Sequence, residues 1–81
     1  MTPITVQYFA MLREQAGKDS ETLELEGQPS AREVFEQLAQ KYHFKLGSQD
    51  IRFACNDQFV PAEQVLKPQD RLVFIPPVSG G

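Results

Sequence analysis

The residues best suited to chemistry stand at the end of the chain, where Gly80 and Gly81 follow Pro76 and Pro77. Proline fixes φ, so the pair predicts an extended segment that leads away from a folded body. Glycine has no Cβ, and a Gly-Gly end can therefore enter a channel too narrow for other residues. The Gly81 carboxylate becomes a useful acyl group only after ATP-driven adenylation, when a nucleophile can capture the mixed anhydride. A frayed terminus without a chemical role is the alternative.

Cys55 and His43 are the single cysteine and the single histidine of the chain. Cys55 shares the two-residue spacing of Ile51 and Phe53, which favours a buried thiol over a reactive one. His43 stands at the polar end of a predicted helix, and this position favours a surface histidine over a proton-transfer role. Zinc and iron–sulfur clusters need several cysteines, and this chain has one cysteine and one histidine, so no metal site is expected. No bound cofactor is expected either.

Three acidic residues, Glu21, Glu24 and Glu26, gather on or beside one predicted strand. A solvated strand face explains them better than a metal or acid–base site, because no histidine accompanies them. The sequence also lacks the phosphate-binding, dinucleotide-binding and metal-binding patterns G-x-x-x-x-G-K-[ST], G-x-G-x-x-G, H-E-x-x-H and C-x-x-C. A small enzyme that uses Cys55 or His43 stays open as an alternative.

Length and charge narrow the class of protein further. A chain of 81 residues predicts one domain with a small core, too small for a large-enzyme architecture. Eight basic against eleven acidic residues give a net charge of −3, which disfavours nucleic acid and anionic membranes. No apolar run approaches the ~18 residues of a membrane helix, and no secretory signal layout is found. Together with the lone cysteine, this predicts a cytoplasmic protein.

Five strands and two helices are predicted to position these residues. Alternation of apolar and polar residues places strands at 4–8, 22–26, 51–55, 58–60 and 71–75. The main helix begins at Ser30, where Glu33 completes an S-x-x-E capping box, and it runs to about His43 with one apolar face. A shorter helix over 10–16 ends at Gly17, and 61–68 is expected to be an irregular crossover with at most one helical turn.

This order of elements predicts a two-layer α+β domain, in which one main helix packs on one face of a mixed five-stranded sheet. It is the order of the ubiquitin-like β-grasp fold. Residues 1–76 would form the domain, and residues 77–81 would form an extended tail.

The face of the sheet away from the helix carries a second functional feature. If Ile4, Val6 and Tyr8 face the helix, strand periodicity puts Phe9 on the open side, and if Leu72 and Phe74 are core it puts Val73 and Ile75 there too. Asn56-Asp57 offers turn chemistry before residues 58–60, and Phe59 beside that turn is expected to join them. We call these four the open-face patch: Phe9, Phe59, Val73 and Ile75. An exposed apolar patch beside the exit of the tail is typical of a protein interface, and scattered surface hydrophobes are the alternative.

The ending Phe74–Gly81, FIPPVSGG, resembles the F-x-P-P-V-[ST]-G-G ending of the small subunits of molybdopterin synthase, the MoaD-type sulfur carriers of the MoaD/ThiS ubiquitin-like family. Residues 8–17 are similar to that family's first strand and its F-A-x-x-R-E-x-x-G continuation, and length and element order agree across essentially the whole chain. Asn56 resembles the Asn of the family's V-N turn. Residues 66–70 resemble its L-x-x-G-D turn, with Gln69 where glycine is usual. A type I turn accommodates Gln69, and a type II turn does not favour it.

The resemblance implies a sulfur-carrying cycle at Gly81. An E1-like adenylyltransferase would use ATP to form a transient acyl-AMP there, and a persulfide sulfur donor protein would convert it to a thiocarboxylate. The tail Val78, Ser79, Gly80 and Gly81 would then enter the large subunit of molybdopterin synthase, in a heterotetramer with two copies of each subunit. There the sulfur would pass to cyclic pyranopterin monophosphate and form the dithiolene of molybdopterin. The chain would be a non-catalytic sulfur donor, with the catalytic residues on the large subunit.

Other readings of the same ending stay open. They are a sulfur carrier for thiamine or cysteine biosynthesis, a ubiquitin-like modifier that forms isopeptide bonds through Gly81, and an interaction domain with an inert tail. Loss of Gly81 separates them, because a carrier would lose sulfur transfer and an interaction domain would keep its affinity.

Overall fold

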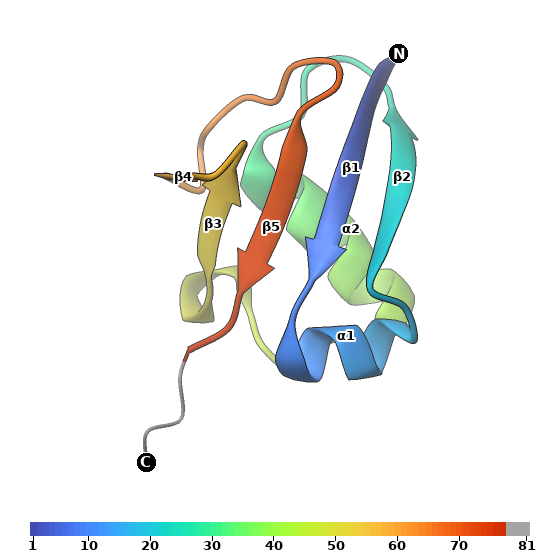
Figure 1. Cartoon of the computed structure of the whole chain (residues 1–81), viewed down its shortest axis with the longest axis vertical. Coiled ribbons are helices and arrows are strands. Elements are labelled where there is room, and N and C mark those ends of the chain that lie inside the picture. Colours follow the sequence, from blue (N-terminus) through green and yellow to red (C-terminus); the bar gives the residue numbers. More distant parts are fainter. Residues whose placement is uncertain (78–81) are drawn as a thin grey trace.

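Two layers, a sheet and a helix laid across it, make up the protein in a computed structural model that describes residues 1–77 (Figure 1). The elements are β1 (Thr2–Tyr8), α1 (Ala10–Ala16), β2 (Ser20–Leu25), α2 (Ala31–Tyr42), the 3₁₀ helix η1 (Ser48–Asp50), β3 (Arg52–Cys55), β4 (Gln58–Val60) and β5 (Arg71–Ile75). Neither α-helix in this described part is both long and apolar enough to span a bilayer.

The sheet has the strand order β2-β1-β5-β3-β4. Its central strands β1 and β5 run parallel, and the other neighbouring strands are antiparallel. Helix α2 crosses one face of the sheet, and α1 lies at the end where β1 and β5 finish (Figure 1). The predicted mixed five-stranded β-grasp sheet under one main helix is confirmed.

The core forms where the inward side chains of β1 and β5 meet α2. Ile4, Val6 and Tyr8 alternate with half-buried residues along β1, as the two-residue period requires. From α2, Phe35 packs edge-on against Phe74 of β5 with ring centroids 5.0 Å apart. Edge-to-face aromatic pairs at such distances are favourable. Burial of this small apolar layer holds helix and sheet together.

Local hydrogen bonds fix both ends of α2. Ser30 Oγ accepts from the Glu33 N–H at 3.2 Å, and Glu33 Oε1 accepts from the Ser30 N–H at 2.8 Å, which completes the predicted capping box. At the other end His43 adopts the left-handed conformation, with φ 59°, and its N–H donates to the Ala39 carbonyl. The helix therefore ends at Tyr42, one residue before its predicted end.

Two connections complete the fold. Before β3, the chain forms η1, which was not predicted: the Gly47 N–H donates to Asp50 Oδ2 at 2.9 Å and closes one turn. The crossover over residues 61–68 is irregular, as predicted, with one turn in which the Gln64 N–H donates to the Pro61 carbonyl at 3.0 Å. Val65 forms a β-bridge with Ser30, and Ala31 donates to the Gln64 carbonyl at 2.9 Å, so the crossover satisfies backbone groups at the start of α2.

Candidate functional site

A row of four side chains crosses the open face of the sheet, on the side away from α2. The strand register pairs Gln7 with Val73, Val73 with Ala54, and Ala54 with Phe59. Partners directly opposite each other in neighbouring strands share a face, so these four residues form one continuous line. The next row pairs Ile75 with Arg52.

The open-face patch surrounds a shallow hollow of about 280 Å³. The lining residues are Gln7, Phe9, Ala54, Asp57, Phe59, Val73 and Ile75. The structure thus brings together all four residues predicted for the patch. A surface hollow lined largely by apolar side chains is typical of a contact with another protein.

One member of the patch is less accessible than predicted. Phe59 is 62% exposed and Phe9 is 43% exposed, but Val73 is only 8% exposed. The prediction that Val73 is an exposed patch residue is therefore wrong, because the larger neighbours stand around the central β5 and leave Val73 as the floor of the hollow. A partner would contact Phe9 and Phe59 first.

The patch lies next to the end of the described chain. Strand β5 finishes at Ile75 within the patch, and Pro76 and Pro77 follow as the last residues described. The predicted tail residues Val78, Ser79, Gly80 and Gly81 lie outside the described residues. The predicted tail therefore follows directly on the strand that contributes Val73 and Ile75 to the hollow.

A tight turn places Phe59 in the patch. Asn56 and Asp57 connect β3 to β4 with φ of 52° and 72°, and Cys55 pairs with Gln58. Positive φ at both central residues defines a type I′ hairpin turn, for which Asn and Asp are suitable residues. The turn chemistry predicted for this dipeptide is confirmed.

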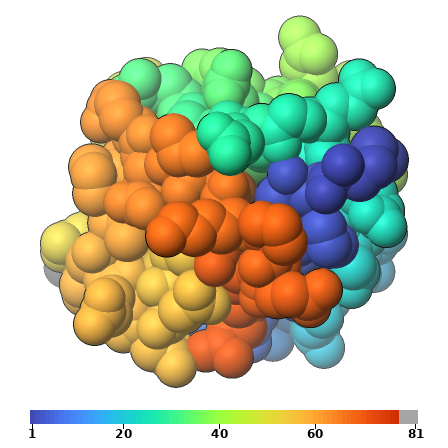
Figure 2. Space-filling view, turned by 90° about the horizontal axis from the view of Figure 1, so that it is seen from above, coloured from blue at the N-terminus to red at the C-terminus, as the bar shows by residue number. Residues whose placement is uncertain are grey.

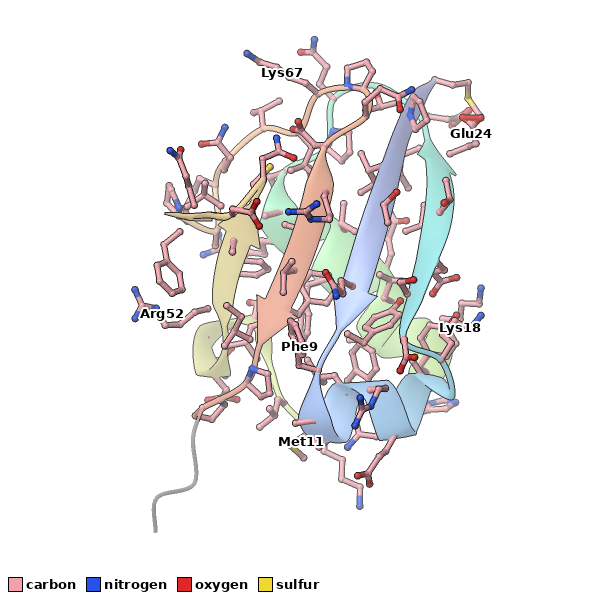
Figure 3. All side chains as sticks on the ribbon, viewed as in Figure 1. Phe9, Met11, Lys18, Glu24, Arg52 and Lys67 are labelled. Atoms are coloured by element: carbon pink, nitrogen blue, oxygen red, sulfur yellow. The ribbon has the colours of Figure 1, made fainter. Side chains whose placement is uncertain are left out.

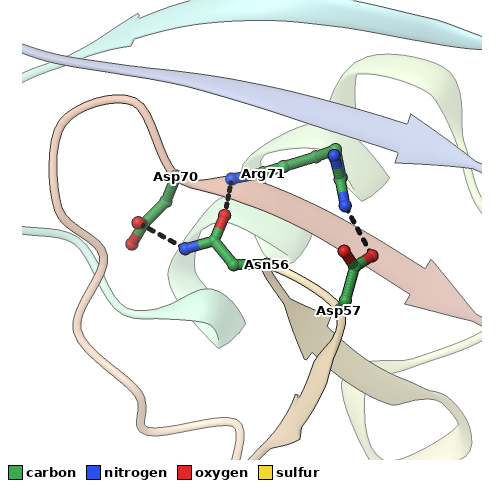
Figure 4. Close-up of polar contacts among 4 residues, drawn as sticks. All are labelled: Asn56, Asp57, Asp70 and Arg71. Carbon is green, nitrogen blue, oxygen red and sulfur yellow. Dashed lines mark hydrogen bonds and ion pairs between the residues drawn. The ribbon is translucent and has the colours of Figure 1, made fainter.

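Asn56 also joins this hairpin to β5 (Figure 4). Its Nδ2 donates to Asp70 Oδ1 at 2.9 Å, and its Oδ1 accepts from the Arg71 N–H at 3.0 Å. The Arg71 guanidinium forms an ion pair with Asp57, the second residue of the turn. These contacts hold the hairpin beside β5, so they position Phe59 relative to Val73. The sequence indicated Asn56 as a turn residue and through its resemblance to the V-N turn, but it did not indicate these contacts with Asp70 and Arg71.

Asp70 is the acceptor at the centre of this arrangement. Its Oδ2 also accepts from the Lys67 N–H at 2.8 Å. Burial by itself would raise the pKa of the Asp70 carboxyl, but the hydrogen bonds from Lys67 and Asn56 outweigh it and lower the pKa. The carboxylate therefore stays charged and bound at neutral pH.

The sequence left open whether the turn that contains Gln69, just before β5, is of type I or type II. The Asp70 N–H donates to the Lys67 carbonyl at 3.1 Å, and Pro68 and Gln69 occupy the central positions. Gln69 has φ 74°, and a left-handed residue after proline defines a type II turn. Figure 2 shows this end of the molecule, where the orange loop lies between the start of β1 and the hairpin. The Gln69 N–H donates to the Pro3 carbonyl at 2.7 Å, which ties the turn to β1.

The structure gives no support to catalysis by Cys55. Cys55 is buried, as predicted, and burial followed by the negative charge of Asp70 raises the pKa of its thiol to about 11. A thiol with that pKa is protonated at neutral pH and is a weak nucleophile. His43 is exposed at the C-terminal end of α2, and Figure 1 shows this end of α2 and the end of β3, which Cys55 occupies, at opposite ends of the molecule. The two residues do not form a catalytic pair.

Glu21 departs from its predicted place on a solvated strand face. It follows the inward parity of Leu23 and Leu25, and its Oε2 accepts from the Tyr8 and Tyr42 hydroxyls at 2.5 and 2.7 Å. Burial acts to raise the pKa of Glu21, but these two hydrogen bonds outweigh it and lower the pKa. Glu24 is exposed as predicted. Within residues 1–77, no set of three or more His, Cys, Asp or Glu side chains could hold a metal ion.

The sheet order, the single covering helix and the open apolar face define a small ubiquitin-like β-grasp domain. The ThiS family matches residues 6–81, and the chain belongs to this family. The molybdopterin synthase sulfur carrier subunit of Haemophilus influenzae is 36% identical over 81 residues, which cover 96% of this chain and 99% of that protein.

Solved structures agree with this assignment. A putative molybdopterin converting factor subunit 1 from Pyrococcus furiosus has a TM-score of 0.81 and 28% identity, covering 96% of this chain and 100% of that one. The small archaeal modifier protein 1 of Methanosarcina acetivorans has a TM-score of 0.77 and 29% identity, covering 100% and 98%. Subunit 1 in a complex of molybdopterin-converting factor subunits from Helicobacter pylori has a TM-score of 0.68, covers 99% and 100%, and at 21% identity shows the fold alone.

Proposed function

We propose that this chain is the sulfur carrier subunit of a molybdopterin synthase. The observation that carries the proposal is the 36% identity, over 96% of the chain, to a protein of that name. The FIPPVSGG ending and the apolar hollow beside β5 agree with it. A sulfur carrier needs a rigid domain with a narrow C-terminal segment that ends in the reacting acyl group. A β-grasp domain with a Pro-Pro-Val-Ser-Gly-Gly ending meets both needs.

In the proposed cycle, Gly81 is the residue that carries sulfur. An E1-like adenylyltransferase joins the Gly81 carboxylate to AMP from ATP and releases pyrophosphate. The terminal sulfur of a persulfide on a sulfur donor protein then displaces AMP to form an acyl disulfide, and a second thiol reduces the S–S bond to leave the thiocarboxylate. ATP is a substrate of the activating protein, and this chain needs no resident cofactor. The sulfur then passes to cyclic pyranopterin monophosphate, which returns Gly81 to a carboxylate that can be adenylated again. The catalytic groups of this transfer belong to the large subunit. The single free cysteine agrees with a cytoplasmic location for this cycle.

The proposed partner on the open face is the large synthase subunit. In Helicobacter pylori, subunits 1 and 2 of molybdopterin-converting factor form a complex. Here Phe9, Phe59 and Ile75 surround a hollow next to the strand that leads into the tail. Covering this surface would bury apolar area and guide Val78, Ser79, Gly80 and Gly81 into the partner's active site. We expect a heterotetramer with two copies of each subunit.

A second function has one specific observation in its favour. The small archaeal modifier protein 1 of Methanosarcina acetivorans is 29% identical and shares the fold. A protein modifier would use the same adenylated Gly81 but pass it to an amine and form an isopeptide bond. Incubation with cell extract and ATP separates the two, because a modifier gives conjugates of increased mass and a carrier does not.

Replacement of Gly81 tests the proposed function. A methyl group at the reacting residue should misplace the acyl carbon, and we expect Gly81→Ala to lower sulfur transfer about 100-fold. Deletion of Gly81 should abolish transfer. Ser79→Ala is the matched control, because it alters the same tail by one small group away from the reacting carbon. Normal sulfur transfer by both Gly81 variants would refute the carrier role.

A further inference from the structure

Arg52 differs from the other arginines of the chain. The other three each have a carboxylate partner, and the pairs are Arg13–Asp19 at 3.7 Å, Arg32–Glu63 at 2.8 Å, and Arg71–Asp57. Within residues 1–77 Arg52 has no carboxylate within 4.0 Å, although the chain is acidic overall, with a net charge of −3. An exposed guanidinium in such a chain is available to a carboxylate from outside.

Phe59 holds Arg52 in place. The guanidinium carbon lies 4.2 Å from the centre of the Phe59 ring, which is a cation–π contact. An aromatic ring takes up none of the guanidinium N–H groups in ordinary hydrogen bonds, so these groups stay able to bind a carboxylate in the two-pronged manner typical of arginine. Figure 3 shows Arg52 at the outer edge of β3. The side chain is therefore oriented before any partner binds.

The position of Arg52 is at the rim of the open-face patch. Its register partner is Ile75, a patch residue, and its stacking partner Phe59 is another. On the far side of Phe59 a second hollow of about 290 Å³ is lined by Arg52 together with Arg32, which is already paired with Glu63. A protein that covers the patch would therefore also remove water from Arg52.

We propose that Arg52 is the charged anchor of the open-face patch and binds a carboxylate of the large synthase subunit. This inference rests on the proposed function. A guanidinium that is desolvated at an interface without a counter-charge weakens binding, so a partner that fits this patch has to supply an acid there. Basic groups of the partner would draw in the tail, whereas the Arg52 contact requires an acid at one defined point. Arg52 thus sets the orientation in which the partner docks.

Charge neutralisation tests the anchor. In titration calorimetry with the large subunit, we expect Arg52→Gln to weaken affinity about tenfold, with a smaller dependence on salt than the wild-type chain. Lys67→Gln is the control, because it makes the same change in net charge at the opposite end of β5, where Figure 3 places Lys67. We expect it to change affinity less than twofold. An Arg52→Gln affinity within twofold of the Lys67→Gln affinity would overturn the proposal.

Kinetics distinguish an anchor from a group that takes part in the chemistry. For Arg52→Gln we expect a higher half-saturating concentration of carrier in sulfur transfer and an unchanged rate at saturation. A lower saturated rate with wild-type affinity would overturn the docking role. Arg52→Lys keeps the charge but loses the planar fork, so we expect it to recover part of the affinity. If the wild-type chain binds the large subunit but transfers no sulfur, the proposed function fails, and calorimetry still tests Arg52 because it measures binding alone.

Discussion

At the scale of single residues, Gln69 is strained. It is the left-handed residue of a type II turn, with φ 74°, a region in which glycine is favoured. We expect Gln69→Gly to raise the free energy of unfolding by roughly 0.5–1 kcal/mol, because relief of ~1–2 kcal/mol of left-handed strain exceeds the entropy that glycine adds to the unfolded chain. Urea denaturation measures this change.

Gln28→Gly is the matched control for that turn. Gln28 is also an exposed loop glutamine, but it is not among the positive-φ residues, so glycine should slightly destabilise the protein there. If the Gln69→Gly protein is no more stable than the Gln28→Gly protein, the assignment of a type II turn at Gln69 is contradicted.

Cys55 tests whether the chain has chemistry of its own. With a pKa of about 11, its thiol is protonated at neutral pH. Cys55→Ala removes buried volume but no reactive group, so we expect a loss of about 1 kcal/mol in unfolding free energy and unchanged sulfur transfer at saturation. A well-folded Cys55→Ala protein that has lost transfer would point to the small-enzyme alternative.

At the scale of elements, Glu21 joins the edge strand β2 to β1 and α2 through Tyr8 and Tyr42. Because its folded-state pKa is lowered, its carboxylate stabilises the protein above its ordinary pKa of 4.5, and that stability is lost as pH falls through the lowered value. We expect Glu21→Gln to reduce the free energy of unfolding at pH 7 by about 1–2 kcal/mol, since a hydrogen bond to a charged group is lost. The loss should shrink in acid, once the pH has fallen through the lowered pKa of Glu21 and both proteins are neutral at this site.

Glu24→Gln provides the comparison on the same strand. Glu24 is exposed, and its substitution should change stability by less than about 0.5 kcal/mol at either pH. Equal effects of the two substitutions would show that the Tyr8–Glu21–Tyr42 contacts do not stabilise β2.

Periodicity and capping chemistry were enough to predict the main elements. The two-residue alternation of β1 and the S-x-x-E box of α2 act locally, so they can be read without knowing the neighbours. The alternation also puts Glu21 in step with Leu23 and Leu25, but the two tyrosines that bind its inward carboxylate lie 13 and 21 residues away and could not be read from it. The Ser30–Val65 bridge likewise depends on a long-range backbone contact.

At the scale of the whole molecule, Phe9 tests the open-face patch. Phe9 is 43% exposed, so Phe9→Lys should leave the fold intact while it places a charge in an apolar contact. We expect its affinity for the large subunit to fall at least about tenfold, which is roughly 1.4 kcal/mol of binding free energy. Titration calorimetry and a thermal melt measure binding and folding separately.

Met11→Lys is the control for surface hydrophobicity. Met11 is 37% exposed but lies on α1 beyond the end of the sheet, as Figure 3 shows, and it does not line the hollow. It should keep wild-type affinity. If Phe9→Lys and Met11→Lys bind equally well, the open face is not where the large subunit docks.

Strand parity predicted that Phe9, Val73 and Ile75 share the open face, and the Asn56-Asp57 turn suggested Phe59, but neither shows how deep each residue lies. Val73 and Phe59 were assigned to one patch, and the register confirms that Ala54 pairs with both. The depth of Val73 depends on the hairpin, which the Asn56 contacts hold beside β5. Those contacts join residues 14 and 15 positions apart, so the shape of the hollow becomes visible only in the folded chain.

The most direct test of the carrier role is the intact mass of the chain after incubation with an adenylating protein, ATP and a persulfide donor. We predict an increase equal to the difference between one sulfur and one oxygen atom, located at Gly81 and lost again when the large subunit and its substrate are added. A chain whose mass never changes under these conditions, although the same components charge the Haemophilus influenzae protein, would contradict the proposed function.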